Sequence, residues 1–340
     1  MRDRTASLLD LLICRIPGLS GDERLKLADR FRNEEDFLRL SKNDVESLLG
    51  RQLGNTRVKF RRSGSWEMDS LRIQAEKDAE FCFKLGIHMV SLREETYPPL
   101  LRESFDPPVL LFYRGFLPDP ERPLAAVVGT RKPSAAAASR AYELGRELGE
   151  AGISVVSGLA LGIDSLAHRG NIDGKVPTVA VLGSSPDMIY PSSNRDLARR
   201  ILETGGLILS EYLPGTGPRR WTFPARNRII SALARGLVLV EAPEKSGALI
   251  SAQLAVDQGR DLWVDAVGIS SPRGAGTARL AEEGAKVISS AEDILREWNM
   301  PVSGRIAGME TGAFGPKIQK KQKPGANLAL SLAEYLEIKA

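Results

Sequence analysis

Short apolar segments alternate regularly with helix-compatible segments between residues 124 and 288. Strands rich in Val, Ile and Leu are predicted at 124–128, 153–156, 178–182, 207–210, 237–240, 261–267 and 286–288. Helices are predicted between them, at 134–151, from 165 onward, and at 194–204, 226–234, 248–258 and 277–283. Because the strands show no polar alternation, both of their faces should be buried under helices. The pattern predicts an α/β fold, a Rossmann-like doubly wound sheet whose strands are mostly parallel.

The N-terminal 65 residues have a different, all-α pattern. Apolar residues recur there at helical spacing, and Pro17, Gly18 and Gly21 separate the helical segments. The stretch IPGLSGDERLKLADRF is similar to helix-hairpin-helix and sterile-alpha-motif-like modules, which often touch DNA backbones through a glycine turn at a helix start. A small helical interaction domain fits the pattern equally well.

We divide the chain into four parts. Residues 1–65 form the small helical module, and 66–123 hold a charged helix, a strand and a proline-rich lead-in that is expected to be an extended connector. Residues 124–298 form the Rossmann-like core. Residues 299–340, too short for a complete winged helix, are expected to be a flexible basic linker followed by an amphipathic helix from Leu328 to Ile338.

Composition excludes several classes of protein. The formal charge of +4 is too small to identify a nucleic-acid binder without knowing where the charges lie. Two cysteines and two histidines leave little for a disulfide framework or a zinc site, so we expect no metal and no cofactor. The sequence contains no apolar run near the roughly 20 residues of a membrane span, and we expect a cytoplasmic protein that does not bind membranes.

One glycine-rich turn, within SVVSGLALGIDSLAHRG, has the composition of an anion-binding loop. Gly158 and Gly162 follow the strand that ends near Ser157, and Asp164 is expected to be the N-cap of the next helix. Such a turn directs backbone N–H groups and a helix N-terminus at one point, which suits a phosphate. The spacing matches neither GxxxxGK[ST] nor GxGxxG, so a tightly held nucleotide is not indicated. An ordinary strand-to-helix turn is the alternative.

Basic and aromatic residues cluster in the loops expected at the carboxyl edge of the sheet, where open parallel sheets bind ligands. These loops are Gly129-Thr130-Arg131, 157–164, RRWTFPARNR at 219–228 and EAPEKSG at 241–247. Four arginines accompany Trp221 and Phe223 in the third loop, which contains no acid. Guanidinium groups beside stacking rings suit single-stranded nucleic acid. The alternative is a solvated arginine surface over a buried Phe223.

An ordered set of motifs runs from residue 127 to residue 260: VVGTR, SGLALGIDSLAH, AVLG followed by YP, SEY, FPARNRIIS, VLVEAPEKSGALISAQLA and GR. In these motifs the sequence resembles the DNA-processing protein A family, also called DprA or Smf. The resemblance implies an extended Rossmann-like domain that binds and protects single-stranded DNA and helps load the RecA recombinase during natural transformation. We also expect a homodimer.

The resemblance assigns roles to individual residues. Arg131 would bind a DNA phosphate, and Phe223 would be a stacking platform. The remaining DNA- or phosphate-binding residues would be Gly129, Thr130, Ser157, Gly158, Gly162, Asp164, Arg226, Asn227, Arg228, Ser246 and Gly247. We expect the loss of Arg131 or Arg226 to weaken DNA binding with little change in melting temperature.

An enzyme is the alternative class. Rossmann-like hydrolases of nucleotide N-glycosidic bonds, of the Lonely Guy type, would use Glu241 as an acid or base. Those enzymes carry a PGGxGT pattern before a glutamate, and this chain lacks that pattern. His168 is expected to form a hydrogen bond inside the fold. We therefore expect a binding protein with no catalytic residues.

Overall fold

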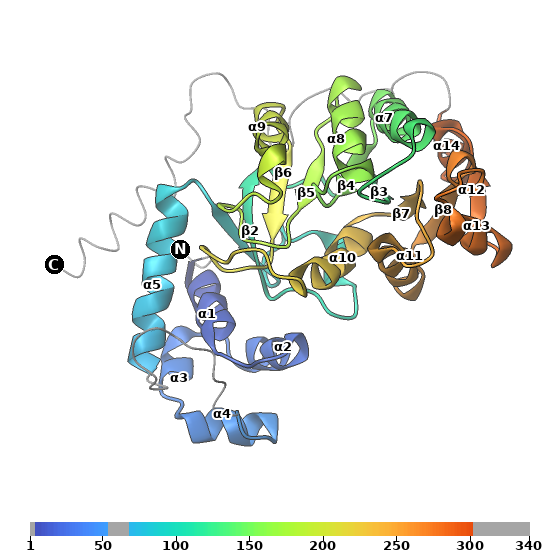
Figure 1. Ribbon diagram of the computed structural model, residues 1–340. Helices are drawn as coiled ribbons and strands as arrows, with labels where there is room; N and C mark the ends of the chain where they lie inside the picture. Colours follow the sequence, from blue (N-terminus) through green and yellow to red (C-terminus); the bar gives the residue numbers. More distant parts are fainter. Residues whose placement is uncertain (1–3, 54–67, 302–340) are drawn as a thin grey trace. The chain divides into compact units, whose positions relative to one another are not determined.

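The computed structural model describes residues 4–53 and 68–301, which belong to two compact units (Figure 1). The smaller unit holds the described residues of Met1–Tyr97 together with Asp106–Phe112. The larger unit holds Pro98–Phe105 and the described residues from Tyr113 onward. The linker and terminal helix expected beyond Pro301 lie outside the described residues.

The smaller unit is mainly helical, as its sequence predicts. Its elements are α1 (Arg4–Arg15), α2 (Gly21–Arg30), α3 (Glu34–Leu38), α4 (Lys42–Leu49), α5 (Met68–Lys84) and β1 (His88–Ser91). Ser20 and Ser41 begin α2 and α4 with reciprocal capping boxes, which satisfy backbone N–H groups that a helix start leaves unpaired. Helix α1 buries Leu9, Leu11 and Leu12 completely or nearly so.

The proline-rich lead-in is not the extended connector that its sequence predicts. It contains a short helix, α6 (Pro99–Arg102), and a strand, β2 (Leu110–Gly115), which neighbours β1. The strand sequence LLFYRG contains no proline, since the prolines lie before and after it. Burial of Leu110, Leu111 and Phe112 stabilises this strand. This tertiary effect outweighs the local tendency of the flanking prolines to disrupt regular structure.

The core of the larger unit is a parallel sheet, which confirms the predicted fold class. Its strands are β3 (Leu124–Val128), β4 (Ser154–Ser157), β5 (Val179–Val181), β6 (Leu207–Ser210), β7 (Gly236–Leu239), β8 (Asp261–Asp265) and β9 (Lys286–Ile288). Their order is β6-β5-β4-β3-β7-β8-β9, and each neighbouring pair is parallel. The order reverses at β3, so the fold is doubly wound.

Helices cover both faces of this sheet. Helices α7 (Ala135–Glu150), α8 (Ile163–Asp173) and α9 (Arg195–Glu203) lie on one face, and α10 (Thr222–Leu233) and α11 (Gly247–Asp257) lie on the other (Figure 1). A short 3-10 helix (Ser192–Asn194) leads into α9, and α12 (Ala266–Ile269), α13 (Ala275–Glu282) and α14 (Ala291–Glu297) follow β8. The strands between the two helical layers are almost entirely buried from β3 to β7.

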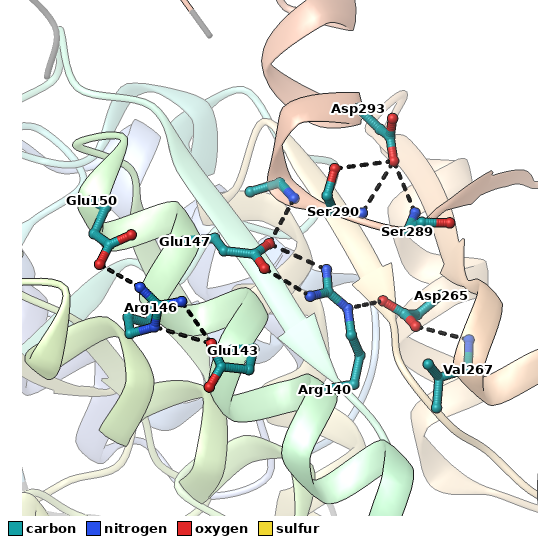
Figure 2. Close-up of polar contacts among 11 residues, drawn as sticks. Arg140, Glu143, Arg146, Glu147, Glu150, Asp265, Val267, Ser289, Ser290 and Asp293 are labelled. Atoms are coloured by element: carbon teal, nitrogen blue, oxygen red, sulfur yellow. Dashed lines mark hydrogen bonds and ion pairs between the residues drawn. The ribbon is translucent and has the colours of Figure 1, made fainter. Parts of the chain in front are cut away.

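A network around Arg140 joins α7 to the end of β8 and to the start of α14 (Figure 2). Arg140 Nε donates to Asp265 Oδ2 at 2.8 Å, and its Nη1 donates to Glu147 Oε1 at 3.0 Å. Glu147 Oε2 accepts the backbone N–H of Ala291 at 2.9 Å, at the start of α14. Asp265 is fully buried and also caps α12 through the N–H of Val267. The charges of Arg140 and Asp265 are thus compensated and hydrogen-bonded inside the fold, as burial requires.

Glycines allow α7 and α8 to approach closely. A Cβ on Gly170 would overlap the carbonyl oxygen of Tyr142, and one on Gly145 would overlap that of Ala167. Neither obstacle is a flexible side chain, because both are backbone atoms. The glycines are therefore required by packing between the two helices.

We expect Gly170→Ala to lower the free energy of unfolding by about 1 to 3 kcal/mol, the usual cost of overpacking a tight interior. Urea denaturation followed by circular dichroism measures this change. Gly217→Ala is the matched control, because a Cβ there would come no closer than 4.0 Å to Met188. Equal stability of the two variants would contradict the proposed backbone contact.

Candidate functional site

The carboxyl edge of the parallel sheet contains a topological switch point between β3 and β7. These strands are neighbours, and the helices that follow them, α7 and α11, lie on opposite faces (Figure 1). The loops after β3 and β7 therefore diverge and leave a crevice at this edge. Because strands β3 to β9 are parallel, the loops singled out from the sequence do share this edge.

The loop after β3 is held by its neighbours on both sides. Thr130 donates its backbone N–H to the carbonyl of Glu241 at 2.8 Å, and its own carbonyl accepts the N–H of Ile163 at 3.2 Å. A Cβ on Gly129 would come within 2.6 Å of the Ile163 side chain and 2.9 Å of the Glu241 carbonyl. Gly129 and Thr130 thus connect the loops after β7 and β4.

The buried side chain of Glu241 holds these loops together from inside the fold. The side chain is fully buried, and its Oε2 accepts the backbone N–H of Ser134 at 2.8 Å. The Ser271 hydroxyl donates to Oε1. Both carboxylate oxygens therefore hold loops that come from three different strands of the sheet.

The glycine turn after β4 is occupied by the chain's own carboxylate. Helix α8 begins at Ile163 with Gly162 as its N-cap, so the expectation that Asp164 is the N-cap is wrong. Gly162 has φ +77°, and a Cβ there would overlap the Thr130 carbonyl, so the turn closes two residues earlier than predicted. Asp164 Oδ2 instead accepts the N–H groups of Gly158 at 3.1 Å and Ala160 at 3.4 Å.

Arg226 is a buried residue, and it lies on a helix. The segment predicted as a loop up to residue 228 is already helical from Thr222, the first residue of α10, and Pro224 in the first turn is compatible with this start. Arg226 is 4% exposed, and its Nη1 donates to the carbonyls of Gly158, at 2.8 Å, and Val181. This burial contradicts our expectation that Arg226 can be removed without loss of stability.

Arg226 and Asp164 form a buried electrostatic pair. Burial raises the pKa of Asp164, and the Arg226 charge and the N–H groups of the turn oppose that rise. Burial lowers the pKa of Arg226 to about 10, and the Asp164 charge opposes that fall. At neutral pH the guanidinium is therefore protonated and compensates the carboxylate.

Several other predicted site residues also have internal partners. The Ser157 hydroxyl donates to the Val127 carbonyl at 2.7 Å in a fully buried position. Arg228 forms a two-pronged ion pair with Glu211 at 2.7 and 3.0 Å. Asn227 Nδ2 contacts the Gly247 carbonyl at 3.4 Å, and Ser246 caps α11 through the N–H of Ala248.

Arg131 and Phe223 meet near the solvent-facing side of the crevice. The Arg131 guanidinium carbon lies 5.5 Å from the centroid of the Phe223 ring, and Arg131 is exposed. Tyr190 packs against Phe223 with ring centroids 5.5 Å apart and is 46% exposed. Trp221 is 59% exposed and packs edge-on against Tyr212, with ring centroids 6.0 Å apart. Sequence reasoning missed Tyr190, although it stands in the YP pair after β5, where an aromatic could have been noted.

His168 is enclosed in the interior, as expected. Its Nδ1 lies 2.8 Å from the Thr178 hydroxyl, which itself donates to the Val155 carbonyl at 2.7 Å. Nδ1 is therefore the protonated nitrogen and donates to Thr178. Burial, assisted by the positive charge of Arg226, lowers the pKa of His168 to about 3.

Exposed cations at the carboxyl edge differ from those on the outer helices. Helix arginines such as Arg146, Arg199, Arg279 and Arg296 form ion pairs with acids in their own helices or at the helix end. At the carboxyl edge, by contrast, six exposed cations have no ion pair with any residue in the described ranges. These are Arg131, Lys132, Arg219, Arg220, Lys245 and Arg273. The edge thus carries uncompensated positive charge.

Residues 4–53 and 68–301 contain no group of three or more His, Cys, Asp or Glu side chains arranged to hold a metal ion. Among their helices, none combines the length and apolar character needed to cross a bilayer.

The fold and the site define a Rossmann-like, doubly wound α/β protein with a cationic and aromatic carboxyl edge. Residues 88–299 match the family model of DNA recombination-mediator protein A, and the chain belongs to this family. The family resemblance inferred from the sequence is thereby confirmed.

Named relatives agree with this assignment. The chain is 39% identical over 214 residues to DNA processing protein DprA of Bacillus subtilis, covering 62% of this chain and 71% of the relative. It is 33% identical over 284 residues to Protein Smf of Borreliella burgdorferi, covering 84% of this chain and 86% of the relative.

Two solved structures are also similar. The X-ray structure of DprA from Streptococcus pneumoniae matches with a TM-score of 0.68 and 32% identity, over 87% of this chain and 99% of that one. DNA processing protein A from Helicobacter pylori, whose structure describes a single-stranded DNA binding mode, matches with a TM-score of 0.55 and 30% identity, over 63% and 95%.

We expect Arg226→Ala to lower the free energy of unfolding by about 3 to 5 kcal/mol, because it leaves the buried Asp164 carboxylate without its compensating charge. Arg131→Ala is the matched control and should change stability by less than about 0.5 kcal/mol, because its side chain is exposed. Urea denaturation of both variants tests this difference. Wild-type stability of the Arg226 variant would show that the guanidinium does not hold the turn.

The lowered pKa of His168 predicts a loss of stability in mild acid. Between pH 6.5 and about 3 the unfolded chain binds a proton at this histidine that the folded chain excludes, so stability falls as pH falls through 6.5. The contribution approaches about 1.4 kcal/mol per pH unit. In His168→Gln, unfolding free energies measured between pH 7 and pH 5 should fall less steeply than in the wild type. Parallel plots of unfolding free energy against pH for the two proteins would contradict a buried, neutral His168. His88 is present in both proteins, so its contribution cancels in the comparison.

Proposed function

We propose that this chain is a recombination mediator that binds single-stranded DNA along the carboxyl edge of its parallel sheet. The observation that carries this proposal is the cluster of Arg131, Phe223 and Tyr190, in which a guanidinium that forms no ion pair within residues 4–53 and 68–301 lies beside exposed ring surface. A phosphate satisfies the charge, and an unpaired base can stack on the rings. Membership of the recombination-mediator family supports the same function.

Single-stranded DNA fits this edge better than duplex does. Aromatic stacking requires a base face that is not already covered by its neighbours in a helix, and it contributes about 1 to 3 kcal/mol per base. The N–H groups of Gly158 and Ala160 in the glycine turn already donate to Asp164. The turn therefore shapes the crevice and does not offer these two N–H groups to DNA. The predicted site residues therefore divide into DNA-contacting groups, Arg131 and Phe223 among them, and groups such as Ser157 and Arg226 that hold the loops in place.

The same geometry favours binding over catalysis. Glu241, the candidate acid or base of an N-glycosidic hydrolase, is fully buried with both oxygens engaged by Ser134 and Ser271. His168 is equally enclosed. We propose that the protein has no enzymatic activity. Incubation with nucleoside monophosphates should therefore release no free base.

Membership of the family also supports a finer role. We propose that the protein is cytoplasmic, forms a homodimer, protects incoming single-stranded DNA and helps load the RecA recombinase on it during natural transformation. The name of the matched family, recombination mediator, supports this role.

We expect the purified protein to bind single-stranded DNA more tightly than duplex of equal length, with affinity falling as salt rises. Phe223→Ala should weaken binding by about 1 to 3 kcal/mol through lost stacking, and Arg131→Ala should also reduce the salt dependence. Fluorescence anisotropy with labelled oligonucleotides measures both effects. Arg279→Ala, which removes a helix cation paired with Glu283, is the control and should bind normally. Equal affinity for duplex would refute the proposal.

A further inference from the structure

The cations at the carboxyl edge that have no ion pair in the described part of the chain lie on both sides of the Arg131–Phe223 contact. One pair, Arg219 and Arg220, directly precedes α10 and is exposed. The neighbouring Trp221 packs against Tyr212, which follows β6 by two residues. This contact places the first pair near the carboxyl end of β6.

The second pair, Lys132 and Arg273, comes from segments that are far apart in the sequence. Arg273 Nη1 donates to the Lys132 carbonyl at 3.1 Å, so the guanidinium lies against the loop after β3. The backbone N–H of Arg273 donates to the Ser271 hydroxyl at 3.2 Å, and Ser271 in turn donates to Glu241, just after β7. These bonds fix the second pair near the carboxyl ends of β3 and β7, although Arg273 follows β8.

Lys245 does not belong to this pair. It lies beside Glu244, which is also exposed and offsets its charge. Lys132 and Arg273 have no such acid neighbour in sequence, since residues 129–134 and 270–275 contain no carboxylate. The two pairs are thus separate concentrations of positive charge on one edge.

The two pairs lie too far apart for a single phosphate group to contact both of them. In the sheet order β6-β5-β4-β3-β7, the first pair is separated from the ends of β3 and β7 by three and four strand spacings. At about 4.8 Å per spacing, the two pairs lie roughly 14 to 19 Å apart across the strands. Phe223 and Tyr190 lie between them, because a Cβ on Gly183, just after β5, would contact the Phe223 ring at 3.0 Å.

We propose that a single strand of DNA crosses the sheet edge perpendicular to the β-strands, with phosphates at Arg219–Arg220 and at Lys132–Arg273 and with bases stacked on Phe223 and Tyr190 between them. This inference rests on the proposed function and adds the direction and the extent of the DNA path. The outer pairs engage only a strand long enough to reach them. A short oligonucleotide is held by Arg131 and the rings alone.

The test compares oligothymidylates of roughly 4 and 16 nucleotides, the range of known site sizes, by fluorescence anisotropy with the full-length protein. The double variants Lys132→Ala/Arg273→Ala and Arg219→Ala/Arg220→Ala should each bind the long strand about tenfold more weakly. Each lost phosphate contact should lower the slope of log K against log salt by about 0.7, or about 1.4 per double variant. Binding of the short strand should change less than about twofold.

Two controls separate charge from structure. Arg273→Lys keeps the cation and should retain most of the wild-type salt slope, whereas a purely structural role for the arginine would leave Lys as defective as Ala. Arg279→Ala removes an exposed arginine paired with Glu283 and should behave as wild type for both strands.

The outcomes distinguish this inference from the proposed function. If the wild type does not bind either strand, the proposed function fails. If the wild type binds both strands but the double variants bind the long strand normally, or lose equal affinity for both lengths, the function stands and the proposed path is wrong. A defect confined to the long strand, with the reduced salt slope, supports the path.

Discussion

The buried pairing of Arg226 with Asp164 is the interaction on which the candidate site depends. Arg226 extends from α10 into the sheet edge and bonds the carbonyls of Gly158 and Val181, so one helix is fixed to the ends of two strands. Phe223 lies three residues earlier, on the same side of α10. The bonds that hold Arg226 therefore also position the ring that Arg131 contacts.

The acidic and basic side chains at this edge have different roles. The carboxylates of Asp164, Glu211 and Glu241 are engaged with groups of the fold, which holds the loops together. Cations such as Arg131 and Arg273 remain exposed and without ion pairs to the described residues. Because these three acids are internally satisfied, the positive charge of the exposed cations is left for an anionic ligand, and the edge can attract phosphates even though the whole chain carries only +4.

Sequence reasoning succeeded where a pattern is local and failed where a contact is distant. The residue types of the glycine turn were recognised, but two of its N–H groups bind Asp164, and only the fold shows that this carboxylate turns inward. An arginine in an apparent loop has the same sequence signal whether it is exposed, as Arg220 is, or buried, as Arg226 is. Tyr190 gave no periodic signal, because its role depends on Phe223, which lies 33 residues away (223 minus 190).

The sequence by itself determined the doubly wound parallel sheet, the edge at which the functional loops lie and the family of the chain. These follow from strand composition, from alternation of elements and from ordered motifs, all of which are local properties. Only the tertiary structure decided which arginines face the solvent, that α10 begins before Phe223, and that Arg273 joins Lys132. The physical reason is that burial and hydrogen bonding at this edge are set by residues that are distant in sequence and meet only when the sheet is complete.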